Sequence, residues 1–387
     1  MPMVRPGLEV LLEQKLDLVR GRRVGLVTNH SAVTSDLTHV VDALLGAGVN
    51  LVALYGPEHG VRGDVACGQE VPSDTDPRTG ILVHSLYGPT KKPTPEMLAD
   101  VDIMLYDLQD VGARFYTFTQ TMSYVMEACG ENGKQIAVLD RPNPVNGVAV
   151  EGGILDAEFT SFIGVHPIPV RHGMTVGELA MLFNKGLGVD TDLEVVPCEG
   201  WKRSMWFDQT GLPWMMPSPN MPTPVAAELY PGLCFVEGTN VSEGRGTTRP
   251  FEMAGAPWAD GYKVAERLNS YGLPGVRFGP VHFIPNASKH QEQRCSGVVV
   301  YVTDRNVVSS VDLGLYVVKT FRDLYPDDFQ FRPPGTSGRH FFDLLAGTDS
   351  VRLAIEDGVS VEEIVNSWAG DELREFMEVR QKYLLYS

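Results

Sequence analysis

Short apolar runs alternate with helix-like stretches over the first 145 residues, and every run ends on polar residues. The runs are VGLVTN, LVALYGPEHG, VDIMLYDLQD and QIAVLDRPNP, at residues 24–29, 51–60, 101–110 and 135–144. Runs that are apolar throughout are typical of strands buried on both faces of a parallel sheet. The pattern therefore predicts an α/β fold built around a parallel sheet.

Apolar residues with helical spacing lie between and after these strands. Residues 37–45 and 122–129 each follow the period of a helix face, and glycine follows each stretch. A third helix is expected from Thr175, because Thr175 and Glu178 have the spacing of a capping box. The remaining expected elements are strands at 81–88, 276–285 and 297–303 and helices at 311–324 and 361–386.

The length of the chain predicts more than one domain. At 387 residues it exceeds what a single hydrophobic core usually contains. Residues 201–250 are rich in Pro, Gly, Trp and Met, and we expect them to form ordered loops. We place the boundary near residue 230, which gives a first domain at 1–230 and a second at 231–387.

Charge limits the kinds of partner that we expect, and cysteine spacing limits the kinds of site. Lys and Arg number 32 against 49 Asp and Glu, a formal net charge of −17, which disfavours nucleic acid and anionic membranes as partners. The cysteines are dispersed, so we expect reduced, mostly buried thiols and neither disulfides nor a zinc site. They are Cys67, Cys129, Cys198, Cys234 and Cys295.

The sequence also bears on the compartment. No apolar stretch is long enough to span a bilayer, and the charged N-terminal segment lacks the apolar core of a secretory signal. As written, the chain is expected in the cytoplasm. It would be extracellular or in the cell envelope if an export signal had been removed. Nothing in the sequence indicates an oligomeric state.

Polar residues at the ends of the four predicted strands are the main candidates for chemistry. In an open α/β sheet, ligands bind in the crevice outside the carboxyl ends of the strands. If the strands are adjacent and parallel, their end residues converge on one site, which indicates an enzyme. These residues are Asn29, Glu58, His59, Asp107, Asp110, Asp140 and Arg141.

Glu58 stands in the sequence GPEHG, whose glycines allow a sharp turn and leave room for a ligand. A carboxyl group in such a place can act as a general acid or base. Alternatively, Glu58 caps the following turn or pairs with Arg62. We expect His59 to orient the site or to contact the ligand, since no second histidine lies at metal-binding spacing.

A second strand end combines Asp107, Gln109 and Asp110, followed by Arg114. Two acids with neighbouring donors can hold sugar hydroxyls, orient a water or bind a divalent cation. Alternatively, one of them caps the helix expected near Thr117 or pairs with Arg114.

A third strand end combines Asp140, Arg141 and Asn143. Prolines at positions 142 and 144 indicate a rigid turn there, so we expect a structural role for this segment.

A Gly-rich stretch in the middle of the chain carries several charges, among them Glu237, Glu243, Arg245 and Arg249, beside Asn240. Arginine forks bind carboxylates or phosphates through paired hydrogen bonds. The stretch lacks Walker spacing, and the chain has no GxSxG or HExxH and no GxGxxG after the first strand. We therefore expect neither a nucleotide cofactor nor a metal.

Longer motifs resemble one family. The YbbC/NamZ-type exo-β-N-acetylmuramidases are similar to this chain from near Gly7 to the C-terminus. The motifs are TNH near Asn29, YGPEHGVRGD (55–64), SLYGPTKKPTPEML (85–98), DLQDVGARFYTF (107–118), LDRPNPVNG (139–147), SPNMPT (218–223) and EGTNVSEGRGTTRPF (237–251).

The resemblance implies a Rossmann-like first domain, a smaller α/β second domain and an active cleft between them. It implies a glycoside hydrolase that releases terminal N-acetylmuramic acid from the non-reducing end of peptidoglycan fragments. The substrate would be a peptidoglycan-derived muropeptide or disaccharide, and the family's catalytic glutamate matches Glu58. Family members are usually exported, whereas this sequence shows no signal peptide.

Glycoside hydrolysis needs an acid at the leaving oxygen and a second group that supplies a nucleophile or stabilises the cation. We expect Glu58 to be the acid. Asp107, Asp110 or the 2-acetamido group of the substrate would fill the second role.

The lactyl carboxylate of muramic acid calls for an arginine, for which Arg245 comes before Arg62 and Arg114. Tyr116 and Trp214 are candidates for apolar platforms under the sugar. The expected substrate-contact residues are Asn29, His59, Arg62, Gln109, Arg114, Tyr116, Asp140, Asn143, His172, Asn220, Glu237, Asn240 and Arg245.

Two other functions rank behind the muramidase. A non-catalytic muropeptide or sugar-acid binding protein would use the same cleft, with Glu58 and Arg245 as ligands only. A metal-dependent hydrolase would act through side chains from three segments, namely His59, Asp107, Asp110 and His172.

Overall fold

The apolar runs of the first part of the chain form neighbouring strands of one sheet. The computed structural model describes residues 3–63, 65, 69 and 74–387, and within these residues the sheet has seven strands in the order β3-β4-β2-β1-β5-β6-β9. Every neighbouring pair is parallel except β3 with β4. The strands are β1 (Val24–Thr28), β2 (Leu51–Gly56), β3 (Asp74–Thr75), β4 (Leu82–Ser85), β5 (Ile103–Asp107), β6 (Gln135–Leu139) and β9 (Asp192–Val196).

The strand order is that of a Rossmann fold. Taken in chain order, the six parallel strands lie side by side as third, second, first, fourth, fifth and sixth. The order reverses between β1 and β5, which is the topological switch point of the sheet. The prediction of an α/β protein with a Rossmann-like, mostly parallel sheet is confirmed.

Helices cover both faces of this sheet. Side chains alternate between the two faces of a strand, so Leu26 and Val27 of β1 belong to different hydrophobic clusters. Leu26 packs in the cluster of α1 and α2, and Val27 in the cluster of α4 and α5. The helices of this part are α1 (Gly7–Gln14), α2 (Val40–Gly46), α3 (Pro95–Leu98), α4 (Thr117–Glu131) and α5 (Val176–Met181), and α5 continues as a π-helical turn over Leu182–Gly186.

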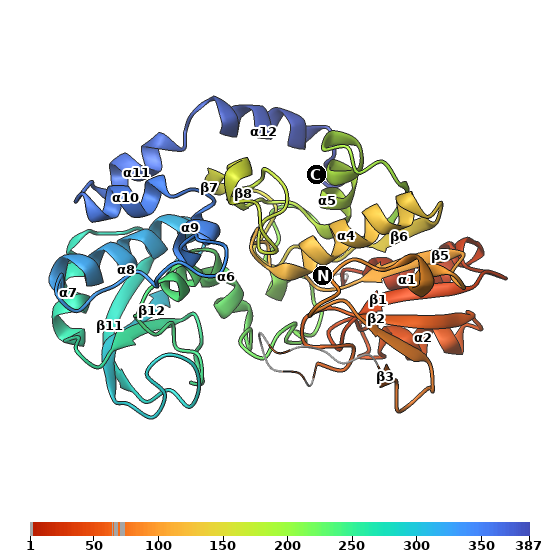
Figure 1. Ribbon diagram of the computed structural model, residues 1–387, viewed down its shortest axis with the longest axis horizontal. Helices are drawn as coiled ribbons and strands as arrows, with labels where there is room; N and C mark the ends of the chain where they lie inside the picture. Colours follow the sequence, from red (N-terminus) through yellow and green to blue (C-terminus); the bar gives the residue numbers. More distant parts are fainter. Residues whose placement is uncertain (1–2, 64, 66–68, 70–73) are drawn as a thin grey trace.

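We call residues 3–223 the first lobe and residues 224–370 the second lobe (Figure 1). The second lobe is built on an antiparallel sheet in the order β10-β12-β11. Its elements are α6 (Pro224–Leu233), β10 (Met253–Ala256), α7 (Gly261–Ser270), β11 (Val276–Phe283), β12 (Cys295–Val302), α8 (Ser310–Leu324), α9 (Phe341–Ala346), α10 (Ser350–Glu356) and α11 (Val361–Ser367). A hairpin of β7 (Glu151–Ile154) and β8 (Pro169–Arg171) belongs to the first lobe and lies next to α8 of the second.

The two lobes share a hydrophobic core. The cluster that contains Val27 and the buried face of α4 also contains Phe235, Val300 and Phe321 of the second lobe. The last helix, α12 (Asp371–Gln381), arches from the second lobe back over the first, where the chain ends (Figure 1). The predicted boundary near residue 230 falls inside α6.

Three segments differ from the expected elements. Leu37 adopts a left-handed conformation (φ 69°) outside α2, which begins at Val40 after its cap His39. The helix expected at 361–386 is broken at Gly370, whose extended backbone separates α11 from α12. Part of the expected loop region is the helix α6, where Thr223 caps the first turn and Pro224 occupies the first helical position.

The four cysteines among the described residues are free and buried, as predicted, and Cys67 lies outside the described residues. Over the described ranges, no helix has the length and apolar character needed to cross a membrane.

Candidate active site

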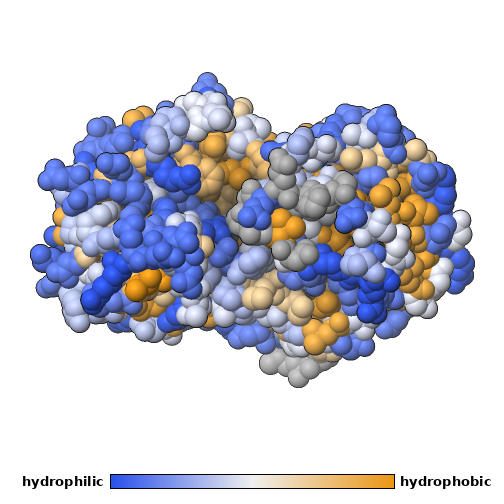
Figure 2. Space-filling view, turned by 60° about the horizontal axis from the view of Figure 1, so that its bottom comes forward, coloured by the Kyte–Doolittle hydropathy of each residue, from blue (hydrophilic) through white to orange (hydrophobic). Residues whose placement is uncertain are grey.

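A cavity of about 570 Å³ lies where the two lobes meet, a volume suited to a small-molecule ligand. Figure 2 shows the surface hollowed between the lobes, with hydrophobic residues visible in the hollow. Four of the predicted site residues line this cavity, namely Glu58, Asn220, Glu237 and Arg245. The other lining residues are Tyr87, Phe115, Thr117, Ile163, Tyr230, Cys234, Gly246, Ala287, Ser288, Arg332, Phe341 and Leu345.

Glu58 reaches the cavity from the turn that follows β2. His59 takes a left-handed backbone conformation (φ 75°), and the N–H of Gly60 donates to the carbonyl of Pro57, which closes the turn. Glu58 is 8% exposed, and the hydroxyl of Thr117, the first residue of α4, donates to its Oε2 at 2.8 Å. The carboxyl group is therefore held in place while it faces the cavity.

His59 and Arg62 fasten the loop after Glu58. The Nδ1–H of His59, which is 3% exposed, donates to the carbonyl of Val65 at 2.9 Å. Arg62 donates to both oxygens of Asp76, at 2.8 and 2.9 Å. Burial by itself would raise the pKa of Asp76. Hydrogen bonds from Arg62 and Thr79 outweigh burial and lower this pKa to about 2. Neither His59 nor Arg62 lines the cavity.

The switch point of the sheet holds a buried ion pair. Asp107, at the end of β5, is fully buried and accepts hydrogen bonds from Arg141 at 2.5 and 3.1 Å. Asn29, at the end of β1, donates to the carbonyl of Pro217 and accepts from the backbone of Ser31. These strand-end groups bind one another and the loop above them, and none of them lines the cavity.

Asp110 and His172 lie together in a second buried place. Oδ2 of Asp110 accepts from the N–H of Gly112 at 2.7 Å and lies 3.5 Å from Nε2 of His172. Nδ1 of His172 accepts from the N–H of Met174, which leaves the ring proton on the Nε2 side that faces Asp110. Both side chains are buried outside the cavity lining.

Asp140 is the centre of a dense hydrogen-bond network. Its carboxylate accepts from the hydroxyls of Tyr386 and Thr175 and from the N–H groups of Gly177 and Arg141. Burial raises the pKa of Asp140 to about 6, against the effect of these hydrogen bonds. Asp140 therefore anchors the end of the chain to the end of β6.

Six further residues that were predicted to contact the substrate have partners within the fold. Gln109 donates to the carbonyl of Pro142, Asn143 to that of Met174 and Asn240 to that of Asp328. Arg114 is fully buried, and it donates to the carbonyls of Gly153, Ile168 and Leu345. Burial lowers the pKa of Arg114 to about 9. Tyr116 packs edge-on against Phe118 and Tyr230, and Trp214 likewise against Phe207.

Glu237 and Arg245 face the cavity as an ion pair at 2.5 Å. Arg245 also pairs with the buried Glu243 at 3.2 Å, and Glu243 pairs with Lys289 at 2.9 Å. The thiol of Cys234 donates to Glu237 at 3.3 Å. Because burial raises the pKa of the Cys234 thiol well above its usual value, this cysteine is not a ready nucleophile.

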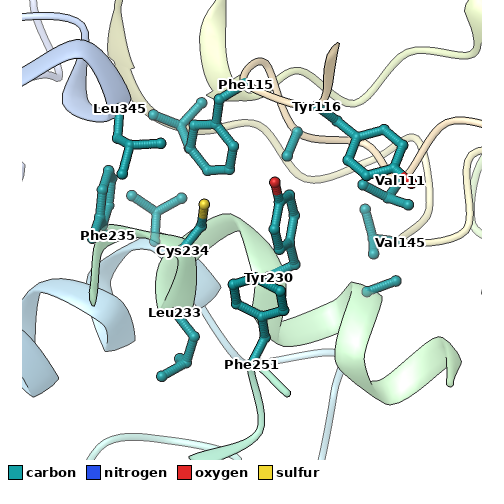
Figure 3. Packing of buried hydrophobic residues seen from close by; sticks show 14 of the residues in the cluster. Val111, Phe115, Tyr116, Val145, Tyr230, Leu233, Cys234, Phe235, Phe251 and Leu345 are labelled. Carbon is teal, nitrogen blue, oxygen red and sulfur yellow. The ribbon is translucent and has the colours of Figure 1, made fainter. Parts of the chain in front are cut away.

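An apolar contact between the lobes forms part of the cavity wall (Figure 3). Phe115, from the loop before α4, packs edge-on against Tyr230 of α6, with ring centroids 5.4 Å apart, and lies 6.3 Å from Phe235. Sequence reasoning missed Phe115 and its neighbour Thr117, although both lie inside the motif DLQDVGARFYTF. It also missed Arg332 and Phe341, which no predicted strand end marks.

The arrangement offers acid–base chemistry and not an obvious metal centre. Within the described part of the chain, no group of three or more His, Cys, Asp or Glu side chains is placed to hold a metal ion. Two of the side chains considered as metal ligands have other partners. His59 donates to the carbonyl of Val65, and Asp107 pairs with Arg141.

Comparison with known proteins gives consistent matches along the whole chain. Family models described as "Exo-beta-N-acetylmuramidase NamZ, N-terminal" and "C-terminal" match residues 24–225 and 228–386. The peptidoglycan beta-N-acetylmuramidase NamZ of Bacillus subtilis (strain 168) is 52% identical over 386 residues, which cover 100% of this chain and 92% of that protein.

Two solved structures have the same fold. Both are DUF1343 family proteins from Bacteroides fragilis NCTC 9343. The first has a TM-score of 0.92 and 40% identity and covers 100% of each chain, and the second has a TM-score of 0.78 and 33% identity and covers 99% of each chain. The chain therefore belongs to the exo-beta-N-acetylmuramidase NamZ family of glycoside hydrolases.

Proposed function

We propose that this protein is an exo-β-N-acetylmuramidase that releases N-acetylmuramic acid from the non-reducing end of peptidoglycan fragments, with Glu58 as the general acid. The observation that carries the proposal is the placement of Glu58 in the cavity between the lobes. The hydrogen bond from Thr117 holds its carboxyl group at the cavity wall. A protonated carboxyl group in this position can donate to the leaving glycosidic oxygen.

Glu237 is the better candidate for the second carboxylate. Asp107 and Asp110, the two expected from the sequence, are buried outside the cavity, whereas Glu237 lines it. Arg245 pairs with Glu237 at 2.5 Å and holds its carboxylate at the cavity wall. An ionised carboxylate can activate a water or stabilise the positive charge that develops on the sugar ring. The substrate's 2-acetamido group remains the alternative nucleophile.

The role of Glu58 is tested by changing the leaving group. For Glu58→Gln, we expect kcat for a muramic acid disaccharide to fall about 100- to 10,000-fold. The loss should be much smaller for a 4-nitrophenyl β-N-acetylmuramide, because nitrophenolate leaves without being protonated. Steady-state kinetics with both substrates measure this difference. Glu131→Gln, an exposed change on α4, is the control and should leave both rates unchanged.

The outcomes separate the possible roles. Equal losses of Glu58→Gln on the two substrates would contradict its assignment as the acid. Glu237→Gln is expected to slow both substrates alike, since its role does not depend on the leaving group. A wild-type protein that binds the disaccharide in calorimetry but releases no product over long incubation would favour the non-catalytic binding protein instead.

A further inference from the structure

The two arginines that line the cavity differ in how far neighbouring carboxylates neutralise their charge. Two arginines, Arg245 and Arg332, contribute to its wall. Arg245 pairs with Glu237 at 2.5 Å and with Glu243 at 3.2 Å, and Lys289 completes a group of two positive and two negative charges. This group has no net charge left for an anionic ligand.

Arg332 is in a different position. Its side chain is exposed, and among the residues that the structure describes no carboxylate forms an ion pair with it. The recorded contact of its guanidinium is with the ring of Phe341, whose centroid lies 5.6 Å away and which also lines the cavity. A guanidinium over an aromatic face keeps the N–H groups on its edge available for another partner.

The backbone of Arg332 is fixed on both sides. Its N–H donates to the carbonyl of Gly238 at 2.8 Å, and its carbonyl accepts from Nδ1 of His340 at 2.7 Å. Pro333 follows directly, and a residue before proline is restricted to extended conformations. The cation is thus presented to the cavity by a segment that needs little ordering when a ligand binds.

We propose that Arg332 recognises the lactyl carboxylate of the terminal muramic acid and so makes the site selective for this acidic sugar. The inference rests on the proposed function. N-acetylglucosamine has the same ring and acetamido group but lacks the 3-O-lactyl group and its carboxylate, so a charge contact with that carboxylate favours muramic acid. With a net charge of −17, the protein as a whole does not attract an anion, and a local cation has to do so.

The test compares substrates that differ in one charge. Kinetic constants are measured for a 4-nitrophenyl β-N-acetylmuramide, for its lactyl methyl amide, which is neutral, and for the corresponding N-acetylglucosaminide. We expect Arg332→Met to lower kcat/KM for the free acid by about 10- to 100-fold, mainly through KM, and to leave the value for the methyl amide unchanged. Arg332→Lys should retain part of the selectivity, because it keeps the charge without the fork.

Arg339→Met is the matched control. Arg339 lies in the same segment, contacts Glu158 and the ring of Phe159, and does not line the cavity, so its variant should behave as the wild type. A kcat/KM of Arg332→Met within twofold of the wild type on the free acid would overturn the inference. Equal losses on the free acid and the methyl amide would also overturn it. A wild type that cleaves none of the three substrates would instead refute the proposed function.

Discussion

At the scale of single residues, Asp140 is a buried acid outside the cavity whose protonation affects the stability of the fold. Its side chain is fully buried, and burial raises its pKa to about 6 from an ordinary value of 3.8. Between these two pH values the folded protein keeps a proton that the unfolded chain has released. The stability that comes from this proton is complete below about pH 4 and is lost as the pH rises through about 6.

Asp140→Asn should remove this pH dependence, because the amide is neutral and the hydroxyls of Thr175 and Tyr386 can turn to accept from it. Relative to the wild type, we expect the variant's free energy of unfolding to improve by up to about 3 kcal/mol between pH 4 and 7. Urea denaturation at several pH values measures the difference. Asp327→Asn, an exposed change, is the control, and an Asp140→Asn difference that does not vary with pH would contradict the prediction.

Sequence reasoning identified some residues that line the cavity, and it also selected residues that lie outside the cavity. The difference has a physical reason. Glu58 and Arg245 stand in Gly-rich turns, which the sequence displays directly. Asp107 also looked catalytic, but its partner Arg141 lies 34 positions away, and a pairing over that distance depends on the fold. Arg332 carries no local signal, because its importance comes from the absence of an ion pair among its described neighbours and not from its own motif.

At the scale of elements, the C-terminal segment that follows α12 binds the first lobe. The hydroxyl of Tyr386 donates to Asp140 and accepts from the N–H of Cys198 at 2.8 Å, and the N–H of Leu385 donates to Glu178. Within α12 itself, Arg380, which is 4% exposed, donates to the carbonyls of Gly147 and Gly173. Together with α12, the segment therefore connects the two lobes on the side of the hairpin β7–β8 (Figure 1).

Tyr386→Phe should weaken this connection. The change removes a donor from the buried Asp140 and leaves the N–H of Cys198 without its acceptor, so we expect a loss of roughly 1–3 kcal/mol in the free energy of unfolding. Tyr383→Phe is the matched control, since no hydrogen bond of its hydroxyl is recorded in the described part of the chain. Urea denaturation compares the two variants, and equal stabilities would contradict a role for the Tyr386 hydroxyl.

The elements themselves were largely predictable. Buried parallel strands show as apolar runs, and the capping box at Thr175 and Glu178 marked the start of α5 correctly. The helix α6 was missed because proline and glycine around it suggested loops, although Thr223 and Pro224 together are a start signal. The break at Gly370 was missed because helical spacing continues on both sides of it.

At the scale of the whole molecule, the cavity does not occupy the switch point where a Rossmann sheet usually binds its ligand. That crevice is filled by the pair of Asp107 and Arg141 and is covered by the loop that carries Pro217, which accepts from Asn29. The cavity lies instead beside the end of β2, where Glu58 meets residues of the second lobe. A site completed by both lobes requires that the lobes keep their relative position.

The continuous core predicts that the lobes unfold together. Phe115, which is 3% exposed, joins them through Tyr230 and Phe235, and its replacement by alanine should cost about 3–5 kcal/mol. Hydrogen exchange with mass spectrometry, followed through a denaturant series, reports α4 and α8 separately. We expect one common midpoint in the wild type and an equal shift of both helices to lower denaturant in Phe115→Ala. Two separate midpoints in the wild type would show that the lobes are independent domains, and a shift of α4 alone would show that Phe115 stabilises only its own lobe.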